Sequence, residues 1–462
     1  MISTRTRTSG RIRRLLTRRR TALVATTALV AALSLAACSG GGGAAPASTK
    51  GAKAAGCTSG ATDLTFWGWP AGYDLAVKKF NQTHPKICVH LENAGASTAE
   101  YTKLSDALTA KSGTPDIATI EYFELPSFEI TNGLVDLSKY GLASAKKDEA
   151  SVAWAQVSQG SKIYAMPVDL GPLALWYNQD QFQKNGLTVP TTWDEFATAA
   201  QTLHEKDPKA AITNFDPVNP QATLALMQQS DAFPFDYSGG KKLGIHFTGE
   251  AQTAFAEYWQ KLISAGEVTT VADFSPAQWS NFDTGVNASR LSPAWGPVGM
   301  QLSIKNTIGS WRAAPLPQTK AGEKRSGNWG GSTLAVIQGT PHAKEAAEFV
   351  RWFGGSEESW KILSGPVAGA FPAYLPTLQS SELQDATLKI SGDSTPNKVF
   401  AEAAQNMVDP QWPPIMTTAL TKWTDIFAGV TKGTETLPEA FAAFQKAMVD
   451  YATSQGFTVS ED

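Results

Sequence analysis

The sequence predicts an α/β fold in which mainly parallel sheets are flanked by helices. Two observations carry this prediction. Near the start of the chain, short apolar runs typical of strands alternate with segments of helical periodicity, and further amphipathic segments recur to the end. The length of 462 residues also exceeds what one hydrophobic core usually holds, so we expect two domains.

The first elements are predicted in the order strand, helix, strand, helix, strand. Apolar runs at 64–67, 87–91 and 117–120 have strand character, and Pro115 precedes the last of them. Between them lie two sets of apolar residues at helical spacing, which are Tyr73, Ala76, Val77 and Phe80, then Tyr101, Leu104 and Leu108. This order predicts a parallel sheet with helices on its faces.

Later helices are predicted from their end signals and apolar faces. A capping box occurs at 192–195 after Pro190, Gly266 closes a second helix, and Pro341 opens a third. The predicted faces are Trp193, Phe196, Ala197, Ala200 and Leu203; Ala251, Ala254, Phe255, Tyr258, Trp259 and Leu262; Ala346, Ala347, Val350 and Phe353; and, in the last helix, Ala440, Phe441, Phe444, Met448 and Tyr451. A further strand is predicted at 333–337.

The amino-terminal residues have the parts of a signal peptide. Residues 1–20 contain eight arginines and no acidic residue, and an apolar run of sixteen residues follows at 22–37. That run is shorter than the ~20 apolar residues of a spanning helix. The sequence Leu35-Ala36-Ala37-Cys38 resembles the lipobox of bacterial lipoproteins, in which the cysteine is acylated after cleavage. We therefore expect a signal peptide at 1–37 and lipidation of Cys38; an ordinary secretory peptide is the alternative, and general or twin-arginine export both stay open.

The segment at 38–57 is composed almost wholly of Gly, Ala, Ser, Pro, Thr and Lys. Such a composition buries too little apolar surface to fold, which predicts a flexible tether after the lipidated cysteine. The folded part is therefore expected outside the cell, anchored to the outer face of the cytoplasmic membrane.

Charge and residue usage argue against a nucleic-acid partner and against a metal or cofactor. Loss of the eight signal-peptide arginines leaves 31 basic against 42 acidic residues, a net charge of −11, so no nucleic-acid partner is expected. With Cys38 assigned to lipid, Cys57 and Cys88 remain as an even pair in an oxidising compartment, and we expect a disulfide between them; two free thiols are the alternative. The histidines have no metal-ligand spacing and no nucleophile or phosphate motif occurs, so no metal and no cofactor are expected.

Six segments, in order along the chain, resemble the family 1 extracellular solute-binding proteins, which are the maltose-binding-protein-like subunits of ABC importers. They are LTFWGW at 64–69, PDI at 115–117, YAMPVDLGP at 164–172, WYN at 176–178, GLTVPTTWDE at 186–195 and GG at 330–331. The resemblance covers essentially the whole chain after the signal peptide. The Asp-x-Gly-Pro at 169–172, followed by Tyr-Asn, resembles the sugar-binding branch of the family.

This resemblance implies a two-lobed, periplasmic-binding-protein-like fold whose chain crosses between the lobes near Asp169 and near Ala368. The first lobe would comprise 58–170 and 325–367, and the second 171–324 and 368–462. The ligand would bind in the cleft between lobes that close around it. The family implies a binding subunit rather than an enzyme, with a sugar or short oligosaccharide as ligand and the permease subunits of an ABC transporter as partners. We expect it to act as a monomer.

Four tryptophans are candidates for stacking on sugar rings, and they are Trp69, Trp295, Trp329 and Trp412. The chain contains fourteen tryptophans, and a sugar needs flat aromatic faces for its C–H surfaces. Trp69 follows the first strand at its carboxyl end, where parallel sheets bind ligands. Trp295 and Trp412 lie in Pro-rich loops, and we favour Trp295. Trp329 precedes a strand, where ligand contact and packing are equally expected.

Polar and backbone candidates complete the predicted site. Glu121 and Tyr122 follow the third strand, where an ionised carboxylate can accept hydrogen bonds from sugar hydroxyls; helix capping is the alternative. Asp169, at the predicted crossing, either binds ligand or fixes the hinge. Gly330 and Gly331 permit close approach of the backbone to ligand or to a neighbour.

Two other classes of function stay open. A secreted glycosidase would also carry aromatic rings and carboxylates, with two carboxyl groups roughly 5 to 9.5 Å apart, and no local pair is evident. A binding protein of the same architecture for a polyamine or an amino-acid derivative would need several acids beside the aromatic rings. Asp169, Glu121 and Glu124 leave this second alternative open.

Overall fold

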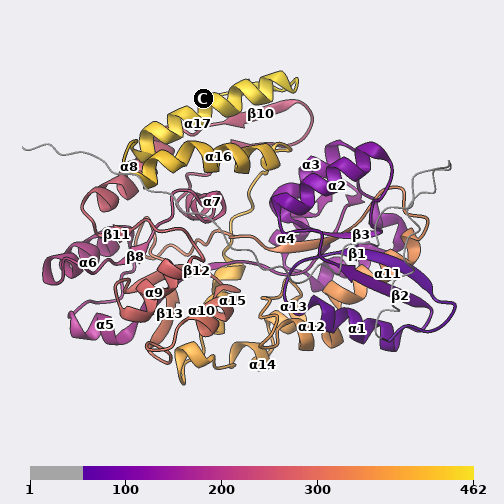
Figure 1. The fold of residues 1–462 in the computed structure, drawn as a ribbon, viewed down its shortest axis with the longest axis horizontal. Coiled ribbons are helices and arrows are strands. Elements are labelled where there is room, and N and C mark those ends of the chain that lie inside the picture. Colours follow the sequence, from indigo (N-terminus) through magenta and orange to yellow (C-terminus); the bar gives the residue numbers. More distant parts are fainter. Residues whose placement is uncertain (1–55, 462) are drawn as a thin grey trace, which may run out of the picture. The chain divides into compact units, whose positions relative to one another are not determined.

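The computed structural model describes residues 56–461, which form alternating helices and strands (Figure 1). The predicted signal peptide, Cys38 and nearly all of the tether lie outside the described residues. Within the described part of the chain, no helix is both long enough and apolar enough to cross a membrane.

A five-stranded sheet contains the first three predicted strands, and we call it the first sheet. Its order is β2-β1-β3-β14-β6. The bounds are β1 Thr62–Trp67, β2 Ile87–Glu92, β3 Ile117–Glu121, β6 Met166–Pro167 and β14 Ser332–Val336. The strands β2, β1 and β3 are parallel, as predicted, whereas β14 pairs antiparallel with both β3 and β6. A sheet that begins at residue 62 is therefore completed by a strand from the last third of the chain.

Helices flank the first sheet. In Figure 1, α2 and α3 lie on one side of β1 and β3 and α1 lies on the other, while α11 packs on β14. The bounds are α1 Tyr73–Thr83, α2 Thr98–Ala110, α3 Leu125–Ile130, α4 Ser151–Gln156, α11 Ala343–Gly355 and α12 Glu357–Leu363, with 3-10 turns η1 Tyr122–Glu124, η2 Leu137–Tyr140 and η3 Leu142–Asp148. Every residue of the predicted apolar faces of α1 and α11 is buried, which confirms both faces. Pro341 precedes α11 instead of opening it, because His342 is the N-cap.

The chain leaves the first sheet after β6 and returns before β14, and these two connections run side by side. β6 pairs with β14, Pro172 bridges to Asn328, and β7 (Leu173–Asn178) pairs with β13 (Trp311–Pro315), each time antiparallel. β12 (Ser289–Pro293) pairs antiparallel with the other side of β7. The direction of these strands differs from the expected mainly parallel arrangement, because an outgoing strand and the strand that returns beside it run in opposite directions.

The remaining elements continue the alternation of helices and strands. Parallel pairing recurs between β8 and β11 and between β10 and β15. The strands are β4 Ser158–Gln159, β5 Lys162–Ile163, β8 Thr213–Asn214, β9 Phe235–Asp236, β10 Lys242–Ile245, β11 Val268–Thr269 and β15 Thr458–Ser460. The helices are α5 Gln179–Lys184, α6 Trp193–Lys206, α7 Pro220–Gln229, α8 Glu250–Ser264, α9 Pro276–Thr284, α10 Gly296–Ser303, α13 Leu375–Leu378, α14 Ser381–Gln384, α15 Asn397–Gln405, α16 Met416–Thr431 and α17 Leu437–Ser454, with a 3-10 turn η4 at Lys389–Ser391.

Two further helix predictions needed adjustment. Thr192 caps α6 as predicted. In a capping box the Glu195 carboxylate would accept a hydrogen bond from the backbone amide of Thr192, but here it accepts one from the amide of Thr191, one residue earlier. On α8, Ala251 and Ala254 are exposed although the aromatic residues of the face are covered. Buried Gln252 and Ala256 take their place on α8.

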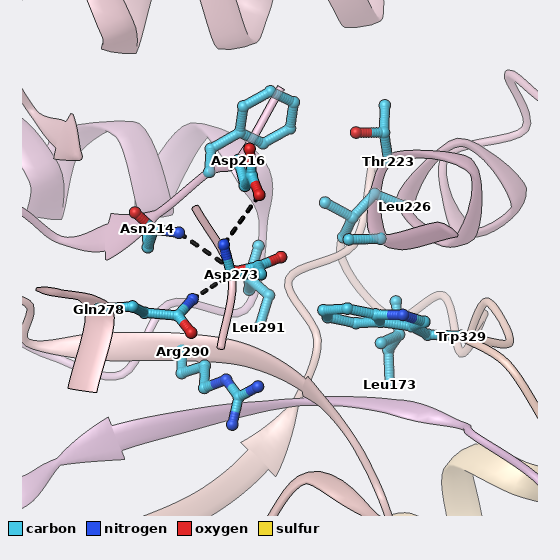
Figure 2. A pocket seen from close by; sticks show the side chains of 12 residues that line it. Leu173, Asn214, Asp216, Thr223, Leu226, Asp273, Gln278, Arg290, Leu291 and Trp329 are labelled. Carbon is cyan, nitrogen blue, oxygen red and sulfur yellow. Dashed lines mark hydrogen bonds between the residues drawn. The ribbon is translucent and has the colours of Figure 1, made fainter. Parts of the chain in front are cut away.

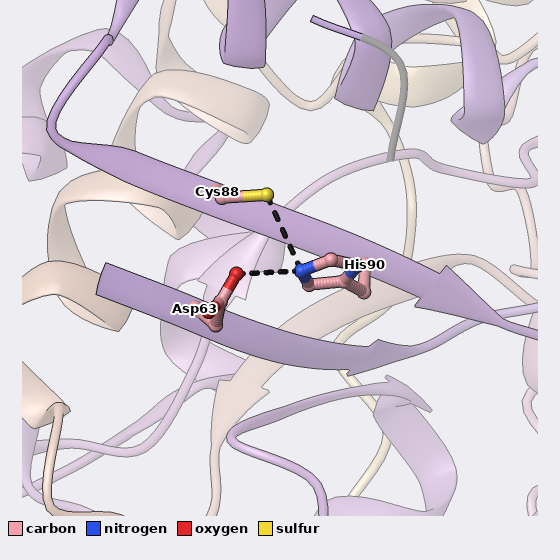
Figure 3. A group of neighbouring side chains, drawn as sticks. All are labelled: Asp63, Cys88 and His90. Carbon is pink, nitrogen blue, oxygen red and sulfur yellow. Dashed lines mark hydrogen bonds and ion pairs between the residues drawn. The ribbon is translucent and has the colours of Figure 1, made fainter. Parts of the chain in front are cut away.

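A disulfide joins Cys57 to Cys88 of β2, with Cα atoms 5.3 Å apart. Beside it, His90 Nε2 lies 2.8 Å from Asp63 Oδ1 and 3.2 Å from Cys88 Sγ (Figure 3). Asp63, Cys88 and His90 are close enough to share a metal ion. However, the Cys88 sulfur is bonded to Cys57 and offers no thiolate, which is the form that binds metals. We therefore assign this group to the crosslink and not to a metal centre.

Candidate ligand-binding site

Glu121 ends β3, at the carboxyl edge of the first sheet, where open α/β sheets bind ligands. Its Oε2 accepts hydrogen bonds from the Ser97 hydroxyl at 2.8 Å and the Tyr101 hydroxyl at 3.0 Å. Burial raises the pKa of Glu121 to about 7, against the lowering effect of these hydroxyl donors. From the described residues, Oε1 receives a long bond from Gln221 Nε2, at 3.4 Å. Oε1 is therefore the oxygen with capacity left for a ligand hydroxyl.

Three aromatic rings from separate segments form a wall near Glu121, and we call Phe274, Trp295 and Trp329 the aromatic wall. The indole N–H of Trp295 donates to the Trp329 carbonyl oxygen at 3.0 Å, and the two rings meet edge to face at 5.7 Å. Phe274 stacks on Trp295 at 6.1 Å. Trp295 lies in the turn between β12 and α10, and it is half-buried. The favoured tryptophan of the sequence therefore belongs to a continuous aromatic surface.

Two consecutive glycines have different roles beside this wall. A Cβ atom at Gly330 would lie 3.5 Å from Glu121 Oε1 and 3.7 Å from Trp295 Nε1, which are ordinary contact distances, so Gly330 lies next to both the carboxylate and the wall. A Cβ atom at Gly331 would lie 2.9 Å from the ring of Tyr122 and 2.9 Å from the Asp169 carbonyl oxygen. Gly331 therefore allows close packing of neighbours, and Gly330 borders the site.

Trp69 is connected to Glu121 through Tyr101. Its ring meets the Tyr101 ring edge to face at 5.9 Å, and the Tyr101 hydroxyl donates to Glu121. Trp69 is half-buried in the turn after β1, so part of its surface stays available. Trp69 therefore reaches the carboxylate only indirectly, through the Tyr101 ring.

Asp169 and Tyr122 lie where the chain leaves the first sheet. Asp169 Oδ1 accepts a hydrogen bond from the Ser332 amide at 2.8 Å, and Asp169 bridges to Pro372. Burial raises the pKa of Asp169 to about 6, and the charge of Asp169 contributes to the raised pKa of Glu121. Tyr122 is buried, and its hydroxyl has no hydrogen-bond partner among residues 56–461. The contacts of Asp169 thus join the two crossing strands next to the site.

Trp412 lines a small hollow next to Gly330, which we call the inner hollow. Its free volume is only about 10 Å³, which is too small for a sugar ring. Its lining residues are Phe123, Gln221, Leu224, Asn328, Gly330, Trp412, Met416 and Leu420. The indole N–H of Trp412 donates to Gln156 Oε1 at 3.1 Å, and its ring packs edge-on against Phe233 at 4.9 Å. Glu124 is buried nearby and accepts a hydrogen bond from Thr417, so its carboxyl group serves packing here.

A polar cluster lies against the other side of the aromatic wall. Asp273 accepts hydrogen bonds from Asn219 Nδ2 at 2.7 Å and from the amides of Asn214 and Gln278. Figure 2 shows Asp216 and Asp273 facing Trp329 across a narrow pocket. Buried Arg290 lies 5.6 Å from the Phe274 ring centroid, a distance typical of a cation–π contact. This cluster fixes the loop that carries Phe274.

Sequence reasoning missed Ser97, Tyr101, Gln221 and Phe274 as site residues. Tyr101 was placed correctly on a buried helix face, but nothing local reveals that its hydroxyl points to Glu121. Gln221 lies 100 residues from Glu121 in the chain, so no local motif joins them. For Phe274 one signal existed, since a large aromatic residue directly precedes the Ser275-Pro276 start of α9.

Crossing strands beside the carboxyl edge of the first sheet are the arrangement expected of a solute-binding protein. The family model described as bacterial extracellular solute-binding protein matches residues 68–359, and the chain belongs to that family. The predicted family is thereby confirmed. Because this family is extracellular and binds solutes, the chain is an exported binding protein.

Individual relatives agree with this assignment. The chain is 27% identical over 343 residues to the arabinooligosaccharide-binding protein of Bacillus subtilis (strain 168), covering 71% of this chain and 77% of that protein. It is 30% identical, with a TM-score of 0.76, to the ABC transporter associated binding protein from B. animalis subsp. lactis Bl-04 in complex with β-1,6-galactobiose, covering 87% of this chain and 100% of that one.

A second solved structure, the galacto-N-biose/lacto-N-biose I-binding protein of Bifidobacterium longum in complex with lacto-N-biose, is 26% identical to the chain with a TM-score of 0.75. The match covers 87% of this chain and 100% of that one. These likenesses confirm the predicted two-lobed, periplasmic-binding-protein-like fold.

Proposed function

We propose that this protein captures a sugar or short oligosaccharide outside the cell and delivers it to the permease of an ABC transporter. The observation that carries the proposal is that Glu121 Oε1 and the indole edge of Trp295 both approach the same point beside Gly330. Aromatic faces suit the C–H surfaces of a sugar, and an ionised acceptor makes strong hydrogen bonds to its hydroxyls. The ligands of the three relatives, arabinooligosaccharide, galactobiose and lacto-N-biose, support the same class.

The proposed division into lobes follows the strand crossings. The first lobe comprises 58–170 and 325–367, and the second 171–324 and 368–462. Support comes from β14, which joins the first sheet from the later segment, and from the Asp169–Pro372 bridge near the second crossing. A ligand that contacts both lobes binds the closed arrangement more tightly and so shifts the equilibrium toward it. Binding by Glu121 from the first lobe and Trp295 from the second meets this condition.

A sugar screen tests the proposed class of ligand. We expect arabinotriose, β-1,6-galactobiose or lacto-N-biose to raise the melting temperature, since a ligand at a hundredfold excess over Kd stabilises the native state by about 2.7 kcal/mol.

Trp295→Ala should weaken binding of the active sugar by roughly tenfold or more, measured by titration calorimetry, because it removes part of the aromatic wall. The matched control is Trp259→Ala, which removes a buried ring of α8 and should lower stability instead. If no sugar raised the melting temperature and spermidine did, the ligand would be a polyamine and not a sugar.

We also propose that Cys38 carries the lipid that holds the protein at the membrane. The lipobox resemblance and the tether composition support this assignment. Cys38→Ser should release the protein into the medium while sugar binding stays unchanged, as followed by fractionation of the producing cells. A variant that stays in the membrane fraction would contradict it.

A further inference from the structure

The residues around the disulfide share one face of the first sheet because of the strand register. In the parallel pair of β1 and β2, Asp63 lies opposite Cys88. His90 is two residues further along β2, so its side chain points to the same face as that of Cys88. The residues that point to the other face, such as Leu64 and Val89, are buried in the core. Since β2 is an edge strand and Asp63 is exposed, the group lies at the surface, where a dissolved ion can reach it.

The side chains of Asp63, Cys88 and His90 turn their donor atoms toward one another (Figure 3). One carboxylate oxygen, the sulfur and one ring nitrogen all lie within 4.8 Å of one another, with His90 Nε2 at 2.8 Å from the oxygen and 3.2 Å from the sulfur. Two ligand atoms of a tetrahedral zinc ion lie roughly 3.3 to 3.8 Å apart at the usual bond lengths. The side chains of Asp63 and His90 are 76% and 31% exposed, so the small outward shift that this requires leaves the core unchanged.

Reduction of the disulfide adds the sulfur of Cys57 as a fourth donor. A thiol reductant breaks the bond between Cys57 and Cys88 by supplying two electrons and two protons, and the reductant is oxidised to its own disulfide. Zn²⁺ displaces the protons of the two cysteine thiols, and neutral His90 binds through the lone pair of Nε2 with its proton on Nδ1. Two thiolates, an imidazole and a carboxylate are donor types that zinc binds, and four is its usual number of ligands. Magnesium and calcium prefer oxygen ligands and do not fit this set.

We propose that the reduced protein binds a zinc ion through Cys57, Cys88, His90 and Asp63, so that the crosslink and the metal site are alternative states of one group. While the disulfide is intact, neither sulfur is a thiolate and the group binds no metal. In the reduced protein the zinc ion joins the segment before β1 to β2, which is the connection that the disulfide makes in the oxidised protein.

The test measures bound zinc in the two redox states. The protein is prepared without a histidine tag and as the Cys38→Ser variant, so that no third thiol is present. It is reduced without oxygen by a phosphine, which becomes a phosphine oxide with oxygen from water and adds no competing sulfur ligand. After incubation with zinc chloride and desalting, elemental analysis should find about one zinc ion per reduced chain and none above background in the oxidised chain. Cobalt(II) in place of zinc should give the visible absorption of a tetrahedral thiolate site.

Variants identify the ligands. His90→Gln and Asp63→Ala should each weaken zinc binding by the reduced protein at least about tenfold, since even groups behind the metal ligands contribute that much. The Cys57→Ser/Cys88→Ser variant should bind no zinc. The matched control is His84→Gln, because His84 ends α1 and its ring contacts Thr83 and Phe80 of that helix. Its zinc affinity should equal that of the parent.

Melting curves show whether zinc binds the folded chain. Zinc should raise the melting temperature of the reduced parent and leave that of the oxidised parent unchanged, because a ligand stabilises the state that it binds. Absence of zinc from the reduced protein, equal amounts in both redox states, or unchanged affinity in His90→Gln or Asp63→Ala would overturn the site. So would a reduced chain that is unfolded and that zinc does not refold.

Discussion

Glu121 has two carboxylate oxygens with different tasks. Oε2 is held by Ser97 and Tyr101, while Oε1 lies near Gly330. The ionised form accepts the stronger hydrogen bond from a hydroxyl donor, and burial raises the pKa of this group to about 7. If Glu121 binds the ligand, affinity should therefore depend on pH.

We predict that the affinity for sugar falls as the pH drops below about 7, because protonated Glu121 is a weaker acceptor. Glu121→Gln should weaken binding about tenfold or more at pH 8, since a hydrogen bond to a charged group contributes roughly 1.5–3 kcal/mol. The difference between variant and parent should shrink at pH 5.5. Titration calorimetry at both pH values measures it.

The control for this prediction is Glu129→Gln on α3. Burial raises the pKa of Glu129 to about 7 as well, but within residues 56–461 its carboxyl group makes no hydrogen bond to a site residue. The Glu129→Gln variant should have the same sugar affinity as the parent and the same pH dependence of that affinity. A parent with constant affinity from pH 5.5 to 8 would show that Glu121 does not bind the ligand.

Among the elements, β2 is the strand tied by the disulfide. Cys57 and Cys88 are 31 residues apart, and closing a loop of that length restricts the unfolded chain. We predict that the Cys57→Ser/Cys88→Ser variant loses about 3 to 4 kcal/mol of unfolding free energy in urea titrations. Sugar affinity should be unchanged, because β2 contributes none of the proposed ligand contacts. A loss below roughly 1 kcal/mol would mean that the crosslink restrains little in the unfolded state.

Elements of the first sheet and their helices could be predicted from the sequence because their signals are local. The spacing of Tyr73 and Phe80 alone predicts which face of α1 is buried. The prediction failed on α8 at Gln252, a polar residue that is buried because its amide reaches the Phe233 carbonyl oxygen. That partner comes from another segment, and an apolar pattern cannot reveal it.

The candidate site, like the fold, could be predicted only where its signals are local. Trp295 and Gly330 follow from residue types that no regular element requires. The pairing of Gln221 with Glu121, and the conformation of Phe274, depend on segments far apart in the chain and are visible only in three dimensions.

At the scale of the whole molecule, buried carboxyl groups set the response of stability to pH. Glu149 is 3% exposed, and neither carboxylate oxygen has a hydrogen-bond partner within residues 56–461. Burial, with a contribution from the charge of Asp148, raises the pKa of Glu149 to about 9. Because this pKa lies above the unfolded value, the folded protein binds the extra proton between roughly pH 4.5 and 9, and stability falls as the pH rises through that window.

We predict that Glu149→Gln removes the contribution of Glu149 to this dependence. Relative to the variant, the parent should lose up to about 1.4 kcal/mol of unfolding free energy per pH unit between pH 5 and 9. Urea titrations at pH 5, 7 and 9 measure the difference, with exposed Glu257→Gln as control. Parallel profiles for parent and Glu149→Gln would show that Glu149 is ionised in the folded protein.

The strand β14 has a consequence for how the chain matures. It is hydrogen-bonded between β3 and β6, and the Thr333 hydroxyl reaches the Ile120 carbonyl oxygen across 213 residues of sequence. Until β14 has been made, β3 presents an unpaired edge that can pair with other chains. Contacts so distant in sequence also form slowly. A chain truncated before residue 332 should therefore aggregate, and the full-length chain can complete the first sheet only once its last third is available.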